Sequence, residues 1–241
     1  MSNSVEKLES IHLGKTTGLR VFVWRVRRAL RELFGGKDVL NVEVSDASAG
    51  KNVRRVYRSI DSLMGKFFPG LVRTTTKDVA MKRLKDMIDE LGYSIVDVDG
   101  TKPWGAFYRM HNDDAERFIE EFFPGLSVKE AKLGNDGVEL SPKFLLVLPG
   151  QRLSWQYHHR RAERWRFLSE GAYFHSSDDT QHERTEVSAG SVVQFARGER
   201  HRLCAKDVDT YCVVAEIWQH TEPNEPSDES DIVRVADDYK R

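Results

Sequence analysis

The first third of the chain carries apolar residues at helical spacing. Over residues 17–36 they recur every three or four positions among several arginines, which predicts an amphipathic helix that Gly35 and Gly36 end. The same period predicts a second helix over residues 53–64 and a third over residues 77–91, ended by Gly92. A short strand is expected over residues 93–98. We therefore expect residues 1–99 to form a mainly helical N-terminal region.

Two short segments in this part of the sequence indicate breaks between elements. The peptide Phe-Phe-Pro-Gly-Leu occurs at residues 67–71 and again at residues 122–126, each time after a helical pattern, and we interpret it as a helix stop. Residues 46–51 end in Gly-Lys but lack the first glycine and the final Ser or Thr of a phosphate-binding loop. We therefore interpret them as a turn.

From Lys143 onward the pattern changes to short β-rich runs separated by turns rich in Gly, Asp and Ser. The runs cover residues 144–148, 152–158, 165–168, 191–195 and 210–218. Short strands at this spacing are typical of an all-β sandwich or barrel. The acidic, proline-containing stretch at residues 221–231 is expected to be an exposed connector.

The composition indicates which partners and which cellular compartment to expect. A formal net charge of −1 gives no general attraction to nucleic acid or to anionic lipid. Cys204 and Cys212 are too few for a disulfide framework, which fits a reducing compartment. No stretch is long and apolar enough to span a bilayer, and residues 1–15 lack the apolar core of a secretion signal. We therefore expect a cytoplasmic protein without nucleic-acid or membrane partners.

Candidate metal ligands lie on one face of an expected strand. Alternate residues of a strand share a face, so Arg152, Ser154, Gln156 and His158 are expected on a polar face, opposite the face of Leu153, Trp155 and Tyr157. In a small barrel, the inner face lines a pocket.

Two further residues extend this set. Glu163 follows after a short turn and can meet His158 across the hairpin, and a later strand and glycine turn deliver His201. Imidazole nitrogens and a carboxylate oxygen suit a borderline divalent ion such as zinc, and the amide oxygen of Gln156 can complete the set. The alternative is that His158 and His201 are structural. We expect His175, His182 and His220 at the surface.

Residues 150–163 and 190–201 resemble the two motifs of the cupin family, in the variant where glutamine replaces the first histidine. Residues 150–165 are very similar to the cupin domain of type II mannose-6-phosphate isomerases, which is also found fused to mannose-1-phosphate guanylyltransferases. Their sequence is Gly-Gln-Arg-Leu-Ser-Trp-Gln-Tyr-His-His-Arg-Arg-Ala-Glu-Arg-Trp. Lys-Pro-Trp-Gly at residues 102–105 and Asp-Ile-Val-Arg at residues 231–234 resemble further motifs of that domain.

The resemblance implies a fold and a ligand set. The fold would be a mainly β C-terminal cupin, a double-stranded β-helix or jelly-roll barrel over residues 100–241, in a chain that is α+β overall. Gln156, His158, Glu163 and His201 would bind one divalent metal, with Zn²⁺ as the expected ion. Residues 109–140 are a helical insertion that the resemblance does not account for, and they could cover the barrel mouth. Pairing through the sheets would make a homodimer.

The resemblance also implies a metal-dependent sugar-phosphate isomerase of carbohydrate metabolism, in which the metal stabilises an enediolate. Candidate groups for binding the substrate phosphate or hydroxyls are Lys143, Arg152 and Arg234, of which Arg152 shares the expected inner face with the ligands. Glu216 interrupts the apolar run at residues 212–218. It is either a general base that faces the lumen or an ion-pair partner of one of these cations.

Two other functions fit the same sequence. A non-catalytic cupin module would bind a sugar phosphate or a nucleotide sugar, while the helical region docks a partner. A cupin epimerase or a metal-dependent oxygenase is the third possibility, and Gln156 makes the oxygenase less attractive because such enzymes use two histidines and one carboxylate on iron. An open lumen would favour the isomerase, whereas a plugged barrel mouth would favour a binding module.

Overall fold

The structure is a computed structural model, and it describes residues 40–46, 51–57 and 60–240. The described residues all belong to one compact unit, Val39–Arg241. The first of the predicted helices lies outside the described residues. The division into residues 1–99 and 100–241 stays a prediction. Among the described helices, none has the length and the apolar character that a bilayer crossing requires.

The predicted second helix is wrong over much of its length. The strand β2 (Lys51–Tyr57) pairs antiparallel with β1 (Leu40–Asp46), and the helix α2 (Ile60–Phe67) begins only after it. Asp46 and Lys51 are register partners, as expected for strands joined by a turn. The valines of this segment fit both a helical and a strand period, and β-branched residues favour the strand once a partner strand is available.

The third helix is confirmed as α3 (Lys77–Leu91). The Thr76 side chain caps its N-terminus by accepting a hydrogen bond from the Val79 amide at 3.4 Å. Gly92 ends it in the left-handed conformation, with φ of 72°. The predicted strand after it is also present, as β3 (Ile95–Asp99). These boundaries are set locally, which explains why the sequence predicts them.

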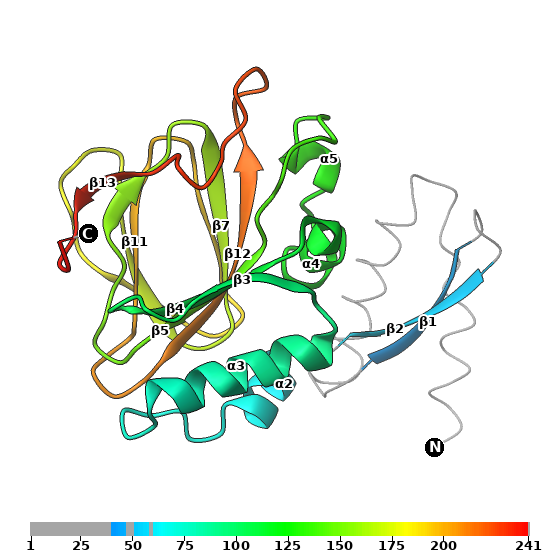
Figure 1. The fold of residues 1–241 in the computed structure, drawn as a ribbon, viewed down its shortest axis with the longest axis horizontal. Helices are drawn as coiled ribbons and strands as arrows, with labels where there is room; N and C mark the ends of the chain where they lie inside the picture. The colour runs from blue at the N-terminus through cyan, green and yellow to red at the C-terminus, as the bar shows by residue number, and fades with distance from the viewer. Residues whose placement is uncertain (1–39, 47–50, 58–59, 241) are drawn as a thin grey trace, which may run out of the picture. The chain divides into compact units, whose positions relative to one another are not determined.

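Two antiparallel sheets form a barrel in the part of the chain that the structure describes (Figure 1). The six-stranded sheet has the order β10 (Val192–Phe195), β7 (Arg161–Phe167), β12 (Cys212–His220), β5 (Lys143–Val147), β4 (Gly105–Met110), β3. The five-stranded sheet has the order β13 (Val233–Ala236), β6 (Trp155–Tyr157), β11 (Arg200–Cys204), β8 (Gly171–Ser176), β9 (Thr185–Val187). From β5 to β12 the chain passes repeatedly from one sheet to the other. This alternation is the double-stranded β-helix, or jelly roll, that the sequence predicts.

The six-stranded sheet separates two hydrophobic cores. On β5, Leu145 and Val147 face the barrel interior, where they pack with Trp165 and Phe167. The alternate residues of β5, Phe144 and Leu146, face outward, because successive side chains of a strand point to opposite faces.

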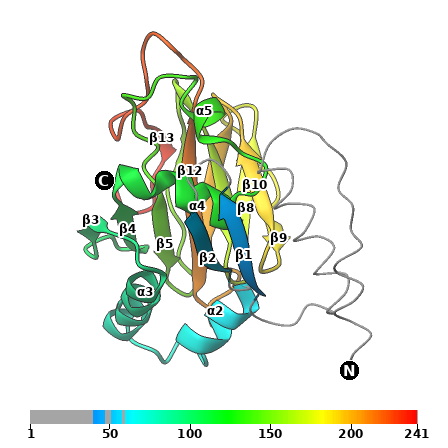
Figure 2. The ribbon, with the colours of Figure 1, turned by 90° about the vertical axis from the view of Figure 1, so that its right-hand side faces the viewer.

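Helices cover this outer face of the sheet, and α3 is among them (Figure 1). The predicted insertion supplies two more, α4 (Ala115–Phe122) and α5 (Val128–Ala131), seen in front of the sheet in Figure 2. Phe118 and Phe122 of α4 pack on Phe144, with ring centroids 5.1 and 5.3 Å apart. The insertion is therefore helical, but the expectation that it could cover the barrel mouth is wrong, because its aromatic residues are buried against the outside of the sheet. Both Phe-Phe-Pro-Gly-Leu peptides follow helices that end at their first phenylalanine, α2 and α4, as predicted.

Candidate metal centre

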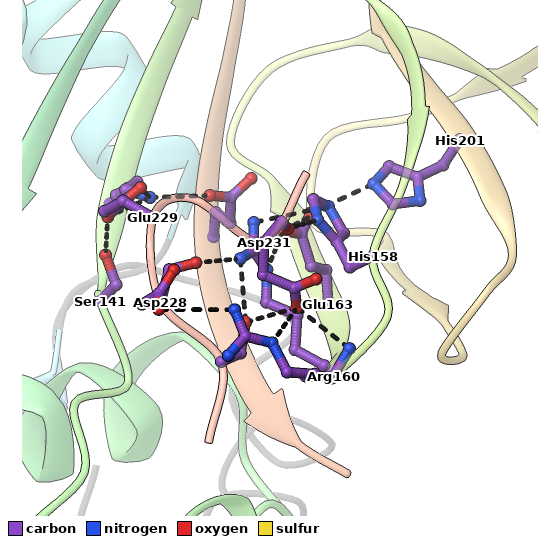
Figure 3. Close-up of polar contacts among 12 residues, drawn as sticks. Ser141, His158, Arg160, Glu163, His201, Asp228, Glu229 and Asp231 are labelled. Carbon is purple, nitrogen blue, oxygen red and sulfur yellow. Dashed lines mark hydrogen bonds and ion pairs between the residues drawn. The ribbon is translucent and has the colours of Figure 1, made fainter. Parts of the chain in front are cut away.

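Three buried side chains converge inside the barrel: His158, Glu163 and His201 (Figure 3). One ligand atom from each lies within 4.8 Å of the others. The Nε2 atom of His158 is 3.0 Å from Oε1 of Glu163, and Nε2 of His201 is 3.3 Å from Oε2 of Glu163. All three residues are at most 2% exposed. The structure thus brings together three of the four ligands that the sequence predicts.

Strand pairing explains how residues that are distant in the sequence meet. His158 follows β6 directly, and a short turn leads into β7, which carries Glu163. His201 lies on β11 and is the register partner of Gln156 on β6. Since paired residues of an antiparallel ladder share a face, Gln156 and His201 both point inward. The sequence pattern predicts His201 after a turn and does not place it on a strand.

The hydrogen bonds of the two histidines orient their metal-binding nitrogens. Nδ1 of His158 contacts the backbone carbonyl of Asp231, and Nδ1 of His201 lies 3.0 Å from the carbonyl of Glu199. A carbonyl oxygen can only accept, so each Nδ1 carries the proton and donates. Each Nε2 then presents a lone pair toward Glu163. Metal-binding histidines have this arrangement in proteins.

The electrostatics favour the protonation states that bind a cation. Burial lowers the pKa of His158, although the adjacent Glu163 carboxylate opposes the shift, so the imidazole is neutral at pH 7. Burial alone would raise the pKa of Glu163, but His158 and the Arg161 guanidinium outweigh this and hold the pKa well below its ordinary value. The centre therefore combines a neutral imidazole with an ionised carboxylate.

Two atoms of this centre show that a metal would fit. Oε2 of Glu163 and Nε2 of His201 are fully buried, and neither has a hydrogen-bond partner. Leaving such atoms unpaired is costly, and one divalent cation bound between them would satisfy both. Two imidazole nitrogens and one carboxylate oxygen are the ligand types of zinc sites that keep a coordination position open. Gln156 is buried beside them, and its Oε1 accepts a 2.6 Å hydrogen bond from the Ser154 hydroxyl. Its role as a fourth ligand stays a prediction.

Lys143 and Glu216 lie on the inner face of the six-stranded sheet, as register partners on β5 and β12. The Lys143 Nζ atom is 3.9 Å from Oε1 of Glu216, and the Trp165 indole donates a 2.9 Å hydrogen bond to Oε2. Burial and the charge of Glu163 raise the pKa of Glu216 to about 7, partly offset by Lys143. The sequence leaves open whether Glu216 faces the lumen or pairs with a cation. In the structure it does both.

The prediction for Arg152 is wrong in its placement. The side chain of Arg152 is 43% exposed and forms an ion pair with Asp238. The alternation used to place it does not extend that far back, because β6 begins only at Trp155 and Leu153 packs into the interior core. Arg234 is the register partner of Gln156 on β13, but its side chain is exposed. Of the three predicted cations, the structure buries Lys143 alone on the inner face.

Arg161 is a site residue that the sequence analysis missed. Its Nε atom donates a 2.9 Å hydrogen bond to Oε1 of Glu163, and its guanidinium carbon lies 3.9 Å from the ring centre of Trp218. It precedes Glu163 by two positions on one strand, so the period of two could have predicted their common face.

The prediction that His220 lies at the surface is wrong. It is 2% exposed and binds the Glu139 carbonyl through Nε2 at 2.7 Å.

The segment Ser227–Asp231, which we call the lid segment, covers this inner face (Figure 3). Asp228 accepts from Arg161 through its carbonyl at 2.8 Å, and Glu229 pairs with Lys143. The Asp231 carboxylate accepts hydrogen bonds from the backbone amides of His159 and Arg160, at 2.9 and 3.0 Å. No sequence pattern points to these contacts, because they join residues about 70 positions apart.

Two observations decide the fold assignment. The strands follow the jelly-roll order, and the three clustered residues come from the two cupin-like segments, residues 150–163 and 190–201. The barrel has the cupin fold. Its inner face presents a metal-type ligand set beside Lys143 and Arg161, which can hold an anion, and beside Glu216, which can exchange a proton.

Comparisons with known proteins found partial similarities. The alginate biosynthesis protein AlgA of Pseudomonas aeruginosa is 27% identical to the chain over 130 residues, which are 52% of this chain and 24% of that protein. The match thus spans about a quarter of that relative's length. No protein-family model matches the chain.

Among solved structures, the chain is similar to a cupin-2 domain protein from Rhodospirillum rubrum. The identity is 12% and the TM-score 0.36, with 57% of this chain and 78% of the other covered. It is also similar to vicilin from Corylus avellana, with 14% identity, a TM-score of 0.39 and coverage of 58% of this chain and 34% of the other.

Proposed function

We propose that the protein is a metal-dependent isomerase that interconverts the aldose and ketose forms of a sugar phosphate, with Zn²⁺ as the bound ion. The observation that carries the proposal is the buried set of His158, Glu163 and His201, whose unpaired atoms face one another on the inner wall of a cupin barrel. The similarity to a protein of alginate biosynthesis supports a role in carbohydrate metabolism.

The chemistry needs a proton carrier and an anion-binding group near the metal ligands. A divalent ion bound by His158, Glu163 and His201 would supply Lewis-acid stabilisation to the charge that develops on the sugar oxygens. Glu216 would take the carbon-bound proton and return it to the neighbouring carbon, because a carboxylate with a pKa of about 7 can do both near neutral pH. Lys143 and Arg161 would hold the phosphate, and the barrel wall would keep water from the reacting carbons.

A second function is favoured by the burial of the centre. The three ligand residues are at most 2% exposed and the lid segment lies over them, so a sugar phosphate must open this cover to reach them. A non-catalytic cupin module that binds a sugar phosphate or a nucleotide sugar would also fit such a closed site. The N-terminal region would then dock a partner.

Turnover and metal content, measured on the same samples, separate the two functions. Zinc-loaded protein would be incubated with mannose 6-phosphate or a heptose phosphate, and NMR would follow proton exchange and ketose formation. The test variant is His158→Ala, and the control is His182→Ala, because His182 is exposed and far from the predicted ligands in the sequence.

We expect one metal per chain and turnover in the wild type and in the control, and loss of both in His158→Ala. Stoichiometric metal without turnover of either sugar would overturn the isomerase and favour the binding module. Absence of metal from the wild type would exclude both versions of the centre.

A further inference from the structure

Two donors hold the carboxylate of Glu229 at the edge of the barrel interior (Figure 3). The ammonium group of Lys143 is 2.8 and 2.9 Å from its two oxygens, and the Ser141 hydroxyl donates to Oε1 at 2.7 Å. Lysine ammonium and serine hydroxyl groups are common donors to phosphate oxygens. The pair therefore forms an anion-binding site, and in this structure a residue of the chain itself occupies it.

The backbone of Ser141 indicates that this site is built rather than incidental. Ser141 is 2% exposed and has φ of 45°, in the left-handed region that residues other than glycine rarely adopt. Such strain persists where the surrounding structure enforces it, and it is concentrated at ligand-binding positions. The conformation directs the Ser141 hydroxyl toward the same carboxylate that Lys143 binds.

The two partners of this ion pair differ in how firmly they are held. The Lys143 side chain is 8% exposed and lies 4.5 Å from the ring centre of Trp218, which also contacts Arg161. The Glu229 side chain is 55% exposed and belongs to the lid segment. An exposed carboxylate can leave an ion pair at low cost, whereas a buried ammonium group needs a counter-anion. The site therefore favours exchange of Glu229 for another anion.

Ser227 and Asp228 of the lid segment would move with Glu229. The Ser227 hydroxyl accepts from Arg161 at 3.1 Å and the Asp228 carbonyl accepts from the same guanidinium at 2.8 Å. Displacing the lid segment would thus release donors of Arg161 together with Lys143 and Ser141. All three would then face an incoming anion beside the metal ligands.

We propose that Ser141 joins Lys143 and Arg161 in the subsite for the phosphate group of the substrate, and that Glu229 is an internal competitor that closes the lid segment when no substrate is bound. This assignment rests on the proposed function in taking the ligand to be a sugar phosphate. The substrate phosphate replaces the Glu229 carboxylate on the same two donors, and the lid segment opens as it binds.

Binding of phosphate compounds to the full chain tests this exchange without any need for turnover. Isothermal titration calorimetry would measure the Kd of inorganic phosphate and of mannose 6-phosphate, for the zinc-loaded protein. The test variant Glu229→Gln keeps the size of the side chain and removes its charge. The matched control is Glu225→Gln, because Glu225 lies close by in sequence, is 73% exposed and pairs with Arg160 at 3.4 Å, outside the subsite.

We expect Glu229→Gln to bind both compounds about 3- to 10-fold more tightly, since the competitor no longer holds the site closed. Glu225→Gln should bind as the wild type does, and Lys143→Met in the Glu229→Gln background should lose the gain. Unchanged or weaker binding by Glu229→Gln, or an equal gain in both glutamine variants, would overturn the proposal. Tighter binding without isomerase turnover would refute the proposed reaction and leave the subsite standing.

Discussion

Asp231 connects the lid segment to the metal centre, and its replacement by asparagine gives a sharp test of that connection. The side chain is 1% exposed. Its two oxygens accept from the amides of His159 and Arg160 and, at 2.7 Å, from the Ser227 hydroxyl. Its carbonyl accepts from Nδ1 of His158. The residue therefore holds both the turn after β6 and the orientation of a candidate metal ligand.

The cost of Asp231→Asn follows from these contacts. An asparagine has one acceptor oxygen in place of two, so it can serve one of the two backbone amides and turns an NH₂ group toward the other. The Ser227 hydroxyl can rotate to accept instead of donating. A buried amide left without its charged acceptor costs about 1–3 kcal/mol, and the surviving bond loses its charge assistance, so we expect a loss of about 2–3 kcal/mol in the free energy of unfolding.

Urea unfolding measures this loss. With a slope of about 2–3 kcal/mol per molar urea, the midpoint should fall by about 1 M. The control is Asp209→Asn, because Asp209 is 68% exposed and pairs with Arg73 at 3.4 Å, a contact of the kind worth about 0–1 kcal/mol. A midpoint for Asp231→Asn within the range of the control, at equal slope, would refute the role given to Asp231.

The pH dependence of the same difference gives a second test. Burial alone would raise the pKa of Asp231, but the hydrogen bonds from Ser227 and from the two backbone amides outweigh it, so the pKa lies below its ordinary value. A lowered folded-state pKa means that the ionised carboxylate stabilises the fold above the unfolded-state pKa of about 4. The gap between wild type and Asp231→Asn should therefore be full at pH 7 and shrink as the pH falls below about 4. A gap independent of pH would contradict the role of the charge.

Three further predictions concern the barrel itself. Burial raises the pKa of Cys204 to about 12 and that of Cys212 further, so neither thiol should react with Ellman's reagent at pH 8 until urea unfolds the protein, and rapid labelling of the native state would contradict this. Phe144 is fully buried between α4 and the sheet, and Phe144→Ala should cost about 3–5 kcal/mol by urea unfolding, well above the cost of an exposed substitution. Gly105→Ala should prevent correct pairing of β4 with β5, because a Cβ atom there would lie 1.8 Å from the Leu146 carbonyl oxygen. A folded variant with wild-type stability would show that the close contact between the two strands does not require glycine.

Local signals were sufficient for several elements. α3 begins at a threonine cap, ends at a left-handed glycine and buries one face, and each of these features lies within the helix or next to it. The alternation around Gln156 and the pairing of His158 with Glu163 across a short turn were likewise predictable, because a strand and its hairpin fix the faces of nearby residues. His201 was expected after a strand and a glycine turn, and its place on β11 beside Gln156 came from the structure.

Non-local pairing decided the rest. Residues 53–57 satisfy a helical pattern, yet they belong to β2 because β1 supplies a partner. The alternation of strand residues would place Arg152 on the face of Gln156. The segment before β6 is irregular, however, and Arg152 pairs with Asp238 instead. Arg161 lies beside the candidate ligands, and its position depends on Glu163, Trp218 and the lid segment together.

The sequence by itself thus indicated an all-β sandwich or barrel from its short-range period, and its resemblance to the cupin motifs implied the fold and the candidate metal ligands. Only the tertiary structure decided which charges share the interior and what covers them. Glu229 reaches Lys143, and Asp231 reaches His158, across 86 and 73 positions of the chain. No local pattern encodes such contacts, because they depend on the register of several strands and on the path of the chain after the last strand of the sheet.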